Sequence, residues 1–165
     1  LQLTQLPLNN QTVNPGGDYW PRGRDSHCIT TVGDLLVLFG GYDGVSQRII
    51  PKGEIEIYDF TKKEWRCEVV CGPEPTPGAG NAIHTLGDTQ KVVVITSNSA
   101  GIFNQMDVLD LKQEPMTWSR VKFDWHGDWT MIPGQRDFFS SVFDSTEGRM
   151  YVFGGRGGGD EGILH

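Results

Sequence analysis

The chain has 165 residues, of which 22 are glycine and 10% are aromatic, and its formal net charge is −7. A net negative chain has no broad attraction to nucleic acid or to anionic lipid. Its longest apolar run is far shorter than the roughly 18 residues that a membrane helix needs. We therefore expect a soluble protein that binds neither nucleic acid nor membrane and is built from many short strands and turns.

The first predicted elements are four short strands. Ser26–Val32 is followed by Gly33-Asp34, a tight hairpin signal, and then by Leu35–Phe39, an apolar run typical of a strand buried on both faces. Glu54–Phe60 alternates charged and apolar residues, which predicts a half-buried strand. Trp65–Val70 is the fourth strand, so this unit of the chain reads as one four-stranded sheet.

The same order of strands recurs twice along the chain. After a proline-marked linker the apolar run Lys91–Ile95 takes the place of the second strand, and Thr96-Ser97 stands where the first unit has Gly40-Gly41. A third unit repeats the run as Arg149–Phe153 and closes it with Gly154-Gly155. Self-similarity at a spacing of roughly 50 residues is the signature of an array of similar units.

Further landmarks of the first unit identify the kind of repeat. Arg24-x-x-His27 leads into its first strand, Tyr58-Asp59 lies at the end of its third, and Trp65 lies in its fourth. With the double glycine, these landmarks resemble the kelch repeat. The resemblance implies an all-β fold, a kelch-type β-propeller segment of about two and a half to three four-stranded blades, with the first strand of each blade at the central channel.

The resemblance also implies a division of the chain. We expect the last strand of a preceding blade and a linker at residues 1–20, a kelch blade at 21–76, a degenerate kelch blade at 77–132 and a truncated kelch blade at 133–165. Propellers typically close with four to eight blades, so the chain represents roughly half of a ring. The remaining blades or self-association would be needed to close it, and the segment alone is expected to self-associate.

Several residues are expected to serve as scaffold. The double glycines would let the backbone turn where a side chain would collide with the adjacent blade, and Trp65 and Trp118 would pack between blades. The resemblance implies that Arg24 and Arg136 tie blades together. Because Thr96-Ser97 replaces the glycines, the second blade should be less regular than the others.

Recognition residues are expected on loops at one face of the blades. The loop after the second strand of the first unit and the link between the second and third units differ most between repeats, and they carry aromatic and arginine side chains, the types enriched in interface hot spots. The resemblance adds three inner-strand positions that look into the channel mouth, Ser26, Gly80 and Phe138. The predicted partner-binding residues are Ser26, Tyr42, Arg48, Trp125, His126, Trp129, Phe138 and Arg156. Arg48 and Arg156 would together favour an acidic or C-terminal carboxylate ligand.

The residue pattern suggests no catalytic chemistry. The histidines are dispersed without metal-ligand spacing, and we expect no metal, no cofactor and no catalytic residue. Cys28, Cys67 and Cys71 are predicted to be small buried hydrophobes suited to a reducing compartment. The sequence favours a non-enzymatic module that binds a protein or peptide, as a substrate receptor or scaffold of a larger complex in the cytoplasm or nucleus. The alternative is the propeller portion of an enzyme resembling a copper-radical oxidase or a specifier protein.

Overall fold

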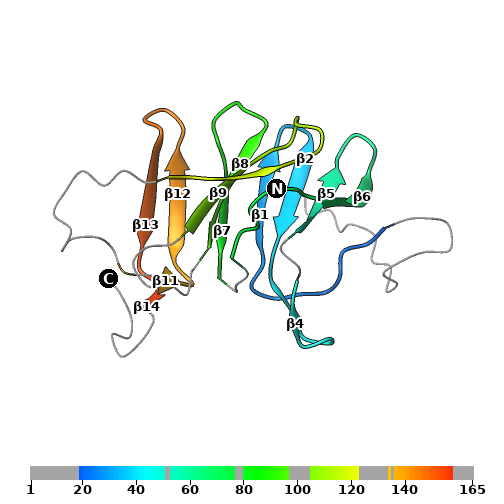
Figure 1. Ribbon diagram of the computed structural model, residues 1–165, viewed down its shortest axis with the longest axis horizontal. Helices are drawn as coiled ribbons and strands as arrows, with labels where there is room; N and C mark the ends of the chain where they lie inside the picture. The colour runs from blue at the N-terminus through cyan, green and yellow to red at the C-terminus, as the bar shows by residue number, and fades with distance from the viewer. Residues whose placement is uncertain are drawn as a thin grey trace, which may run out of the picture.

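The computed structural model describes residues 19–50, 53–76, 80–96, 105–122, 134 and 136–157. Within these residues the chain forms strands, turns and loops and no helix, so the all-β prediction is confirmed. The strands are β1 (Cys28–Val32), β2 (Leu35–Phe39), β3 (Tyr42–Asp43), β4 (Arg48–Ile49), β5 (Glu54–Asp59), β6 (Glu64–Val69), β7 (Ala82–Thr85), β8 (Lys91–Thr96), β9 (Gln105–Asp110), β10 (Trp118–Arg120), β11 (Arg136–Asp137), β12 (Ser140–Asp144), β13 (Arg149–Phe153) and β14 (Arg156–Gly157). Figure 1 shows them as three groups side by side.

The first group, unit 1, is an antiparallel sheet in the order β1-β2-β5-β6. Its strands begin and end within two residues of the predicted bounds. Val37 pairs with Thr30 on one side and with Ile57 on the other, and both Val37 and Ile57 are fully buried. The continuous apolar run of β2 is therefore explained by its place inside the sheet, with a strand along each edge and side chains packed on both faces.

The second group, unit 2, is an antiparallel sheet in the order β7-β8-β9-β10. Its described strands pair without interruption, so the expected irregularity is not found in them. The difference from unit 1 lies at the end of the second strand. Thr96 stays extended and pairs with Gln105, whereas Gly40, at the corresponding position, turns away with φ 67°. Replacing glycine by threonine thus lengthens the strand by one residue.

The third group, unit 3, is the β12–β13 hairpin. A separate short pair, β11 with β14, brackets the open end of this hairpin. Figure 1 places β11–β14 and the small β3–β4 hairpin at the lower edge of the molecule, while the turns of the long hairpins lie at the upper edge. We call the edge that carries β3–β4 and β11–β14 the lower face.

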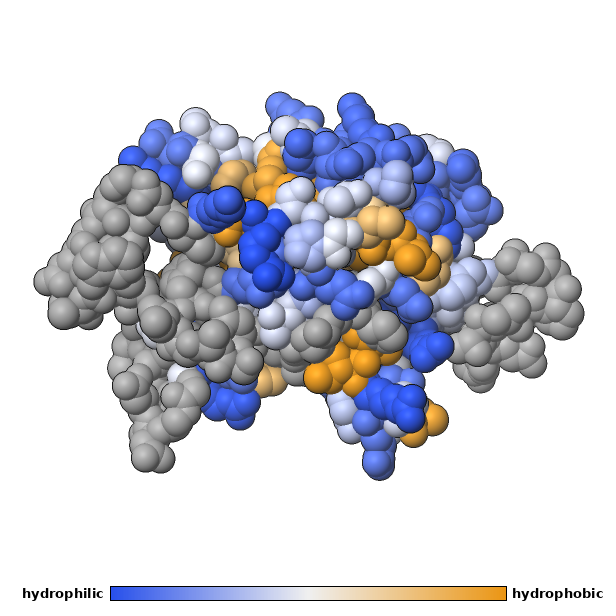
Figure 2. Space-filling view, in the orientation of Figure 1, coloured by the Kyte–Doolittle hydropathy of each residue, from blue (hydrophilic) through white to orange (hydrophobic). Residues whose placement is uncertain are grey.

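The core lies between the units. Phe39 of unit 1 packs edge-on against Trp118 of unit 2, with ring centroids 5.6 Å apart, and both side chains are buried. The prediction that Trp118 packs between blades is confirmed. Trp65 differs, because its ring centroid lies 5.2 Å from that of Tyr58 in its own unit and 6.5 Å from that of Trp20. On the face of the molecule drawn in Figure 2, hydrophobic residues form separate patches among hydrophilic ones.

Polar side chains of the innermost strands also join the units. The Thr85 hydroxyl donates to the Thr31 carbonyl at 2.6 Å, across units 1 and 2. His84 Nε2 lies 2.8 Å from Ser141 Oγ, across units 2 and 3. Since β7 lies against both β1 and β12, the three units stack through their first strands.

The two double glycines share one geometry. Gly40 and Gly154 both have φ 67°, and Gly41 and Gly155 have φ 98° and 99°, a region that side chains rarely adopt. A Cβ at Gly41 would lie 2.6 Å from the Asp25 carbonyl oxygen. Glycine is required here, as expected. The prediction that a side chain would collide with the adjacent blade was wrong, because the group in the way belongs to the segment that leads into β1 of the same unit and folds back over the end of β2.

Candidate interaction surface

The three first strands begin at a common line of backbone hydrogen bonds on the lower face. The Gly80 N–H donates to the Ser26 carbonyl and the Phe138 N–H donates to the Gly80 carbonyl, each at 3.3 Å. All three residues have left-handed backbone, with φ 53° at Ser26, 72° at Gly80 and 51° at Phe138. The predicted inner-strand positions Ser26 and Phe138 are therefore brought together in one structure, which we call the inner ladder.

Phe138 is the exceptional member of the inner ladder. Positive φ is unusual for a bulky residue and costs on the order of 1–3 kcal/mol. The residue is nevertheless 53% exposed. Gly80 leaves room for this conformation, because a Cβ at Gly80 would lie 2.7 Å from the Phe138 nitrogen and 2.9 Å from its ring. A strained backbone that holds an aromatic ring toward solvent is typical of a recognition site rather than of a core.

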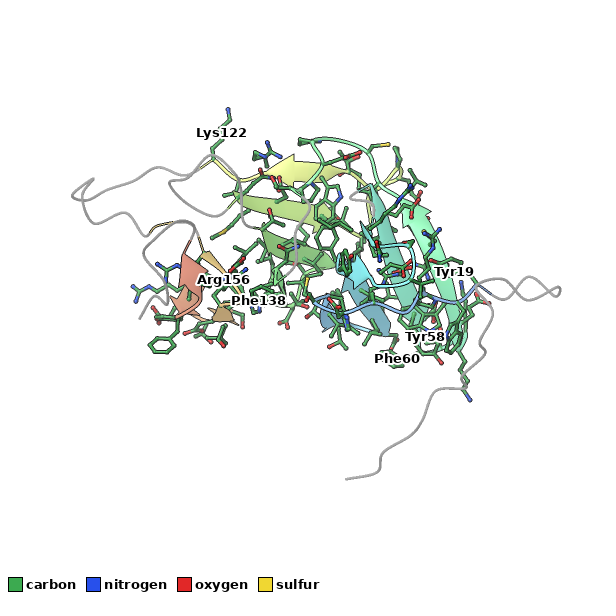
Figure 3. The ribbon with its side chains drawn as sticks, turned by 90° about the horizontal axis from the view of Figure 1, so that it is seen from below. Tyr19, Tyr58, Phe60, Lys122, Phe138 and Arg156 are labelled. Atoms are coloured by element: carbon green, nitrogen blue, oxygen red, sulfur yellow. The ribbon has the colours of Figure 1, made fainter. Side chains whose placement is uncertain are left out.

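Arg156 covers the Phe138 ring. Its guanidinium carbon lies 5.2 Å from the ring centroid, and its Nε and Nη2 donate to the two carboxylate oxygens of Asp137 at 3.1 and 2.9 Å. The hydrogen bonds and charge of Asp137 raise the pKa of Arg156. Figure 3 shows Phe138 and Arg156 side by side, with Tyr58 and Phe60 at the other end of the molecule. We call Asp137, Phe138 and Arg156 the aromatic–guanidinium cluster.

The β3–β4 hairpin forms another part of the lower face. Residues 42 to 53 were expected to form a long loop, but Tyr42 pairs with Ile49 and Asp43 with Arg48. The buried Asp43 carboxylate accepts hydrogen bonds from the Val45 and Ser46 amides at 2.9 and 3.2 Å and from the Ser46 hydroxyl at 2.7 Å, which lower its pKa. The hairpin is anchored by two 3.0 Å backbone hydrogen bonds between Tyr42 and Asp25.

Arg24 has a role in its own unit rather than between units. Its Nη2 lies 2.6 Å from both carboxylate oxygens of Glu56, and its Nη1 donates to the Gly40 carbonyl at 3.2 Å. Only 3% of the Arg24 side chain and 7% of the Glu56 side chain are exposed. The Tyr19 hydroxyl also donates to Glu56 at 2.6 Å, and its pKa is raised, first by burial and then by Glu56. Arg24 thus ties the lead-in of β1 to β2 and β5.

Arg136 repeats part of this arrangement in unit 3. Its Nη1 donates to the Gly154 carbonyl at 3.1 Å, as Arg24 does to Gly40, and its Nε donates to the carbonyl two residues earlier, at Gly134. The hydrogen bonds and ion pair of Arg24 lie within unit 1, which corrects the expectation that Arg24 joins blades.

The predicted binding residues are distributed as follows. Ser26, Tyr42, Phe138 and Arg156 lie on the lower face, while Trp125, His126 and Trp129 lie outside the described residues. Arg48 and Arg156 do not form a joint carboxylate site, because Figure 1 places β4 and β14 at opposite sides of the lower face. Asp137 was missed as a site residue, although the sequence itself holds a signal, since an Arg-Asp pair occurs at both 24–25 and 136–137.

The described residues include no group of three or more His, Cys, Asp or Glu side chains placed to hold a metal ion. A search of the same residues finds no helix long and apolar enough to span a membrane.

All three cysteines are unpaired, and only Cys28 is buried, with burial raising its thiol pKa to about 12. Cys71 is exposed, which corrects its predicted burial, because its backbone bridges to Thr117 while its side chain faces out.

Comparison with known proteins agrees with the architecture. Residues 23–68 match the kelch motif, which spans the lead-in and all four strands of unit 1. The host cell factor homolog hcf-1 of Caenorhabditis elegans is 27% identical over 143 residues, covering 82% of this chain and 16% of that protein. The flagellar outer-arm dynein alpha chain of Chlamydomonas reinhardtii is 28% identical over 142 residues, or 84% of this chain and 3% of that protein.

A third relative is an acyl-CoA-binding domain-containing protein 5 of Arabidopsis thaliana, 29% identical over 100 residues, 61% of this chain and 15% of that protein. The chain therefore spans 16% or less of the length of these relatives. The kelch match, the all-β architecture and the repeated double glycine agree with one another: unit 1 carries a kelch motif, and the antiparallel sheets fit a partial kelch β-propeller.

Proposed function

We propose that the chain is a recognition module that binds a protein or peptide across its lower face, as a substrate receptor or scaffold within a larger assembly. The aromatic–guanidinium cluster carries this proposal. Exposed aromatic and arginine side chains contribute most to interface hot spots, because they bury a large area at modest entropic cost. Here both are fixed before any ligand arrives, since Asp137 holds Arg156 with two hydrogen bonds and the inner ladder holds Phe138.

Preorganisation supports the same proposal. Ordering a long side chain on binding costs about 0.5–1.5 kcal/mol, and Arg156 is already ordered by its fork to Asp137. The charges of Asp137 and Arg156 cancel, so the cluster suits a ligand that presents apolar or aromatic groups to Phe138. The β3–β4 hairpin adds Val45, 96% exposed, and Ile49, 44% exposed, as further apolar contacts on the same face.

The test is selection of peptides from a random library on the full chain, followed by measurement of their dissociation constants. Phe138→Asn removes the ring but keeps a residue that tolerates positive φ. We expect selected peptides to bind this variant tenfold or more weakly, the loss typical of a hot spot, on the order of 1.4 kcal/mol or more. Arg156→Ala should also weaken them.

Two matched variants serve as controls. Phe60→Ala removes an aromatic ring of similar exposure, 45%, from the turn between β5 and β6, which Figure 1 places at the upper edge. Arg149→Ala removes an arginine that is 66% exposed, against 65% for Arg156, from the turn end of the β12–β13 hairpin, whereas Arg156 lies beyond the open end of that hairpin. Selected peptides that bind all four variants equally, or that lose affinity only with the controls, would refute the lower-face proposal.

A further inference from the structure

We propose that Arg156 and Phe138 together bind an uncharged peptide carbonyl next to an aromatic or apolar side chain, and that they disfavour a carboxylate at the same place. This ligand chemistry rests on the proposed function of the lower face, because it specifies what the aromatic–guanidinium cluster would accept. It follows from the part of the Arg156 guanidinium that Asp137 leaves unused.

The unused part of Arg156 is one edge of its guanidinium. A guanidinium carries five N–H donors in a planar fork. Asp137 accepts from Nε and from one N–H of Nη2, at 3.1 and 2.9 Å, and so occupies one edge of the fork. The adjacent edge consists of Nη1 and the second N–H of Nη2, which point in parallel and can donate to one acceptor group. We call it the free edge of Arg156, because no described residue accepts a hydrogen bond from it.

The free edge is held in a fixed orientation. The two hydrogen bonds to Asp137 set the plane of the guanidinium, and its carbon lies 5.2 Å from the centroid of the Phe138 ring. Backbone pairing of β11 with β14 places Asp137 directly opposite Arg156. Donors that are positioned before the ligand arrives lose little conformational freedom on binding.

A ligand that covers Phe138 must also satisfy this edge. Phe138 and Arg156 lie side by side (Figure 3), and the Arg156 side chain is 65% exposed, so a ligand on the ring also removes water from the guanidinium. Removing N–H donors from water without providing an acceptor is costly. A purely apolar ligand would leave the free edge unsatisfied, and we therefore expect the ligand to place a hydrogen-bond acceptor there.

Asp137 determines which acceptor is preferred. A ligand carboxylate would be attracted by Arg156 but repelled by the Asp137 carboxylate, which already lies 2.9 Å from the same guanidinium. Covering a carboxylate also costs more hydration than covering a carbonyl, and the net charge of the chain, −7, adds to the repulsion. An uncharged carbonyl avoids the repulsion and most of the desolvation cost.

One peptide residue can supply both groups. The ring centre of a phenylalanine lies roughly 4–6 Å from its own main-chain carbonyl group, as bond lengths dictate. The Phe138 ring centroid and the Arg156 guanidinium carbon are 5.2 Å apart. An aromatic side chain packed on the exposed part of Phe138 would therefore bring its own carbonyl within reach of the free edge.

The experiment compares two probes with the same ring and different charge, N-acetylphenylalaninamide, which is neutral, and N-acetylphenylalanine, which carries a carboxylate. Each is titrated into the full isotope-labelled chain, and NMR follows the Phe138 amide and the Arg156 Nε–H. We expect the amide probe to bind with a dissociation constant on the order of 1 mM. The acid probe should bind about threefold or more weakly. Phe138→Asn should abolish the binding of both at this place.

Asp137→Asn tests the reason for this preference. The substitution removes the carboxylate and leaves the charge of Arg156 uncompensated, so the preference should reverse and the acid probe should bind more tightly than the amide probe. A purely structural role of Asp137 would not reverse the order of the two probes. Asp34→Asn is the control, because it removes an exposed charge from the turn between β1 and β2 at the upper edge and should leave the preference unchanged. Circular dichroism verifies that both variants fold.

Tighter binding of the acid probe by the unmodified chain, no binding of the amide probe, or an unchanged preference in Asp137→Asn would overturn the proposed ligand chemistry. The lower-face proposal fails by a different result. Library-selected peptides that depend on Phe138, together with a preference for the acid probe, would show that only the ligand chemistry is wrong. Selected peptides that do not depend on Phe138 would contradict recognition at the lower face itself.

Discussion

Units 1 and 2 each pair a buried acid with an arginine, but the arginine comes from a different part of each unit. Each has a buried acid at the same register position of its third strand, Glu56 in β5 and Asp107 in β9. Unit 1 neutralises it with Arg24 from the lead-in of its first strand, and unit 2 with Arg120 from its fourth strand. Glycine stands at the Arg24 position of unit 2, in Gly78. The repeat therefore retains the charge pair and not the position of the arginine, because an unpaired buried carboxylate is costly.

The largest effect is expected when the pair in unit 1 is broken. Arg24→Ala leaves Glu56 buried without its cation, which should lower the free energy of unfolding by about 3–5 kcal/mol. Urea denaturation followed by circular dichroism measures it. Arg22→Ala, an exposed arginine two residues earlier, should change stability by less than about 0.5 kcal/mol. Similar values for both variants would show that the Arg24–Glu56 pair does not stabilise unit 1.

The double glycine is the second place at which unit 1 differs from unit 2. Gly41→Ala puts a Cβ 2.6 Å from the Asp25 carbonyl oxygen at φ 98°, and should cost about 1–3 kcal/mol. Gly44→Ala is the control, because nothing lies within 4 Å of its added Cβ. Thermal unfolding compares the two, and a Gly41→Ala variant as stable as Gly44→Ala would contradict the proposed close approach.

A smaller effect is expected at the pair in unit 2. Asp107 is fully buried but Arg120 is 47% exposed, and Gln105 also donates to Asp107. Solvent screens the charge of Arg120, and the Gln105 side-chain amide still donates to Asp107 when Arg120 is removed. Arg120→Ala should therefore lower the free energy of unfolding by about 1–2 kcal/mol, less than Arg24→Ala. Lys122→Ala, a nearby exposed cation, provides the control in the same urea titration. A cost larger than that of Arg24→Ala would reverse the comparison.

The smallest effect concerns the polar contact between units 2 and 3. Burial lowers the pKa of His84 in the folded chain, below its usual value of about 6.5. Below that pH the unfolded chain binds the proton more readily, so the contribution of His84 to stability is present above pH 6.5 and is lost as the pH falls. Unfolding measured from pH 7.5 to 5 should show this decline, and His84→Gln should reduce it. An unchanged decline would exclude His84 as its source.

The strands could be predicted from the sequence because their signals are local. The apolar runs of β2, β8 and β13, the alternation in β5 and the turn at Gly33 each depend on a few neighbouring residues. The site was only partly predictable. Ser26 and Phe138 were placed by analogy with the kelch repeat, but nothing in the sequence indicates that their backbones share positive φ or meet through Gly80.

Long-range pairing explains the remaining differences. The partner of Arg24 is 32 residues away, and the choice of Glu56 follows from the register of β5 on β2. The β3–β4 hairpin was missed although Asp43-Gly44 is a recognised turn signal, because the flanking strands are only two residues long. The pairing of Arg156 with Asp137 could not be predicted, because it depends on the pairing of β14 with β11.

Amide hydrogen exchange with and without a selected peptide tests the lower-face proposal most directly. Bound peptide should slow exchange at the inner ladder and the aromatic–guanidinium cluster, in residues 25–27, 80–81 and 136–139, and along the β3–β4 hairpin. The turns at the upper edge, residues 33–34, 60–63 and 145–148, should exchange at unchanged rates. Protection confined to those upper turns, or its absence from the inner ladder, would contradict recognition at the lower face.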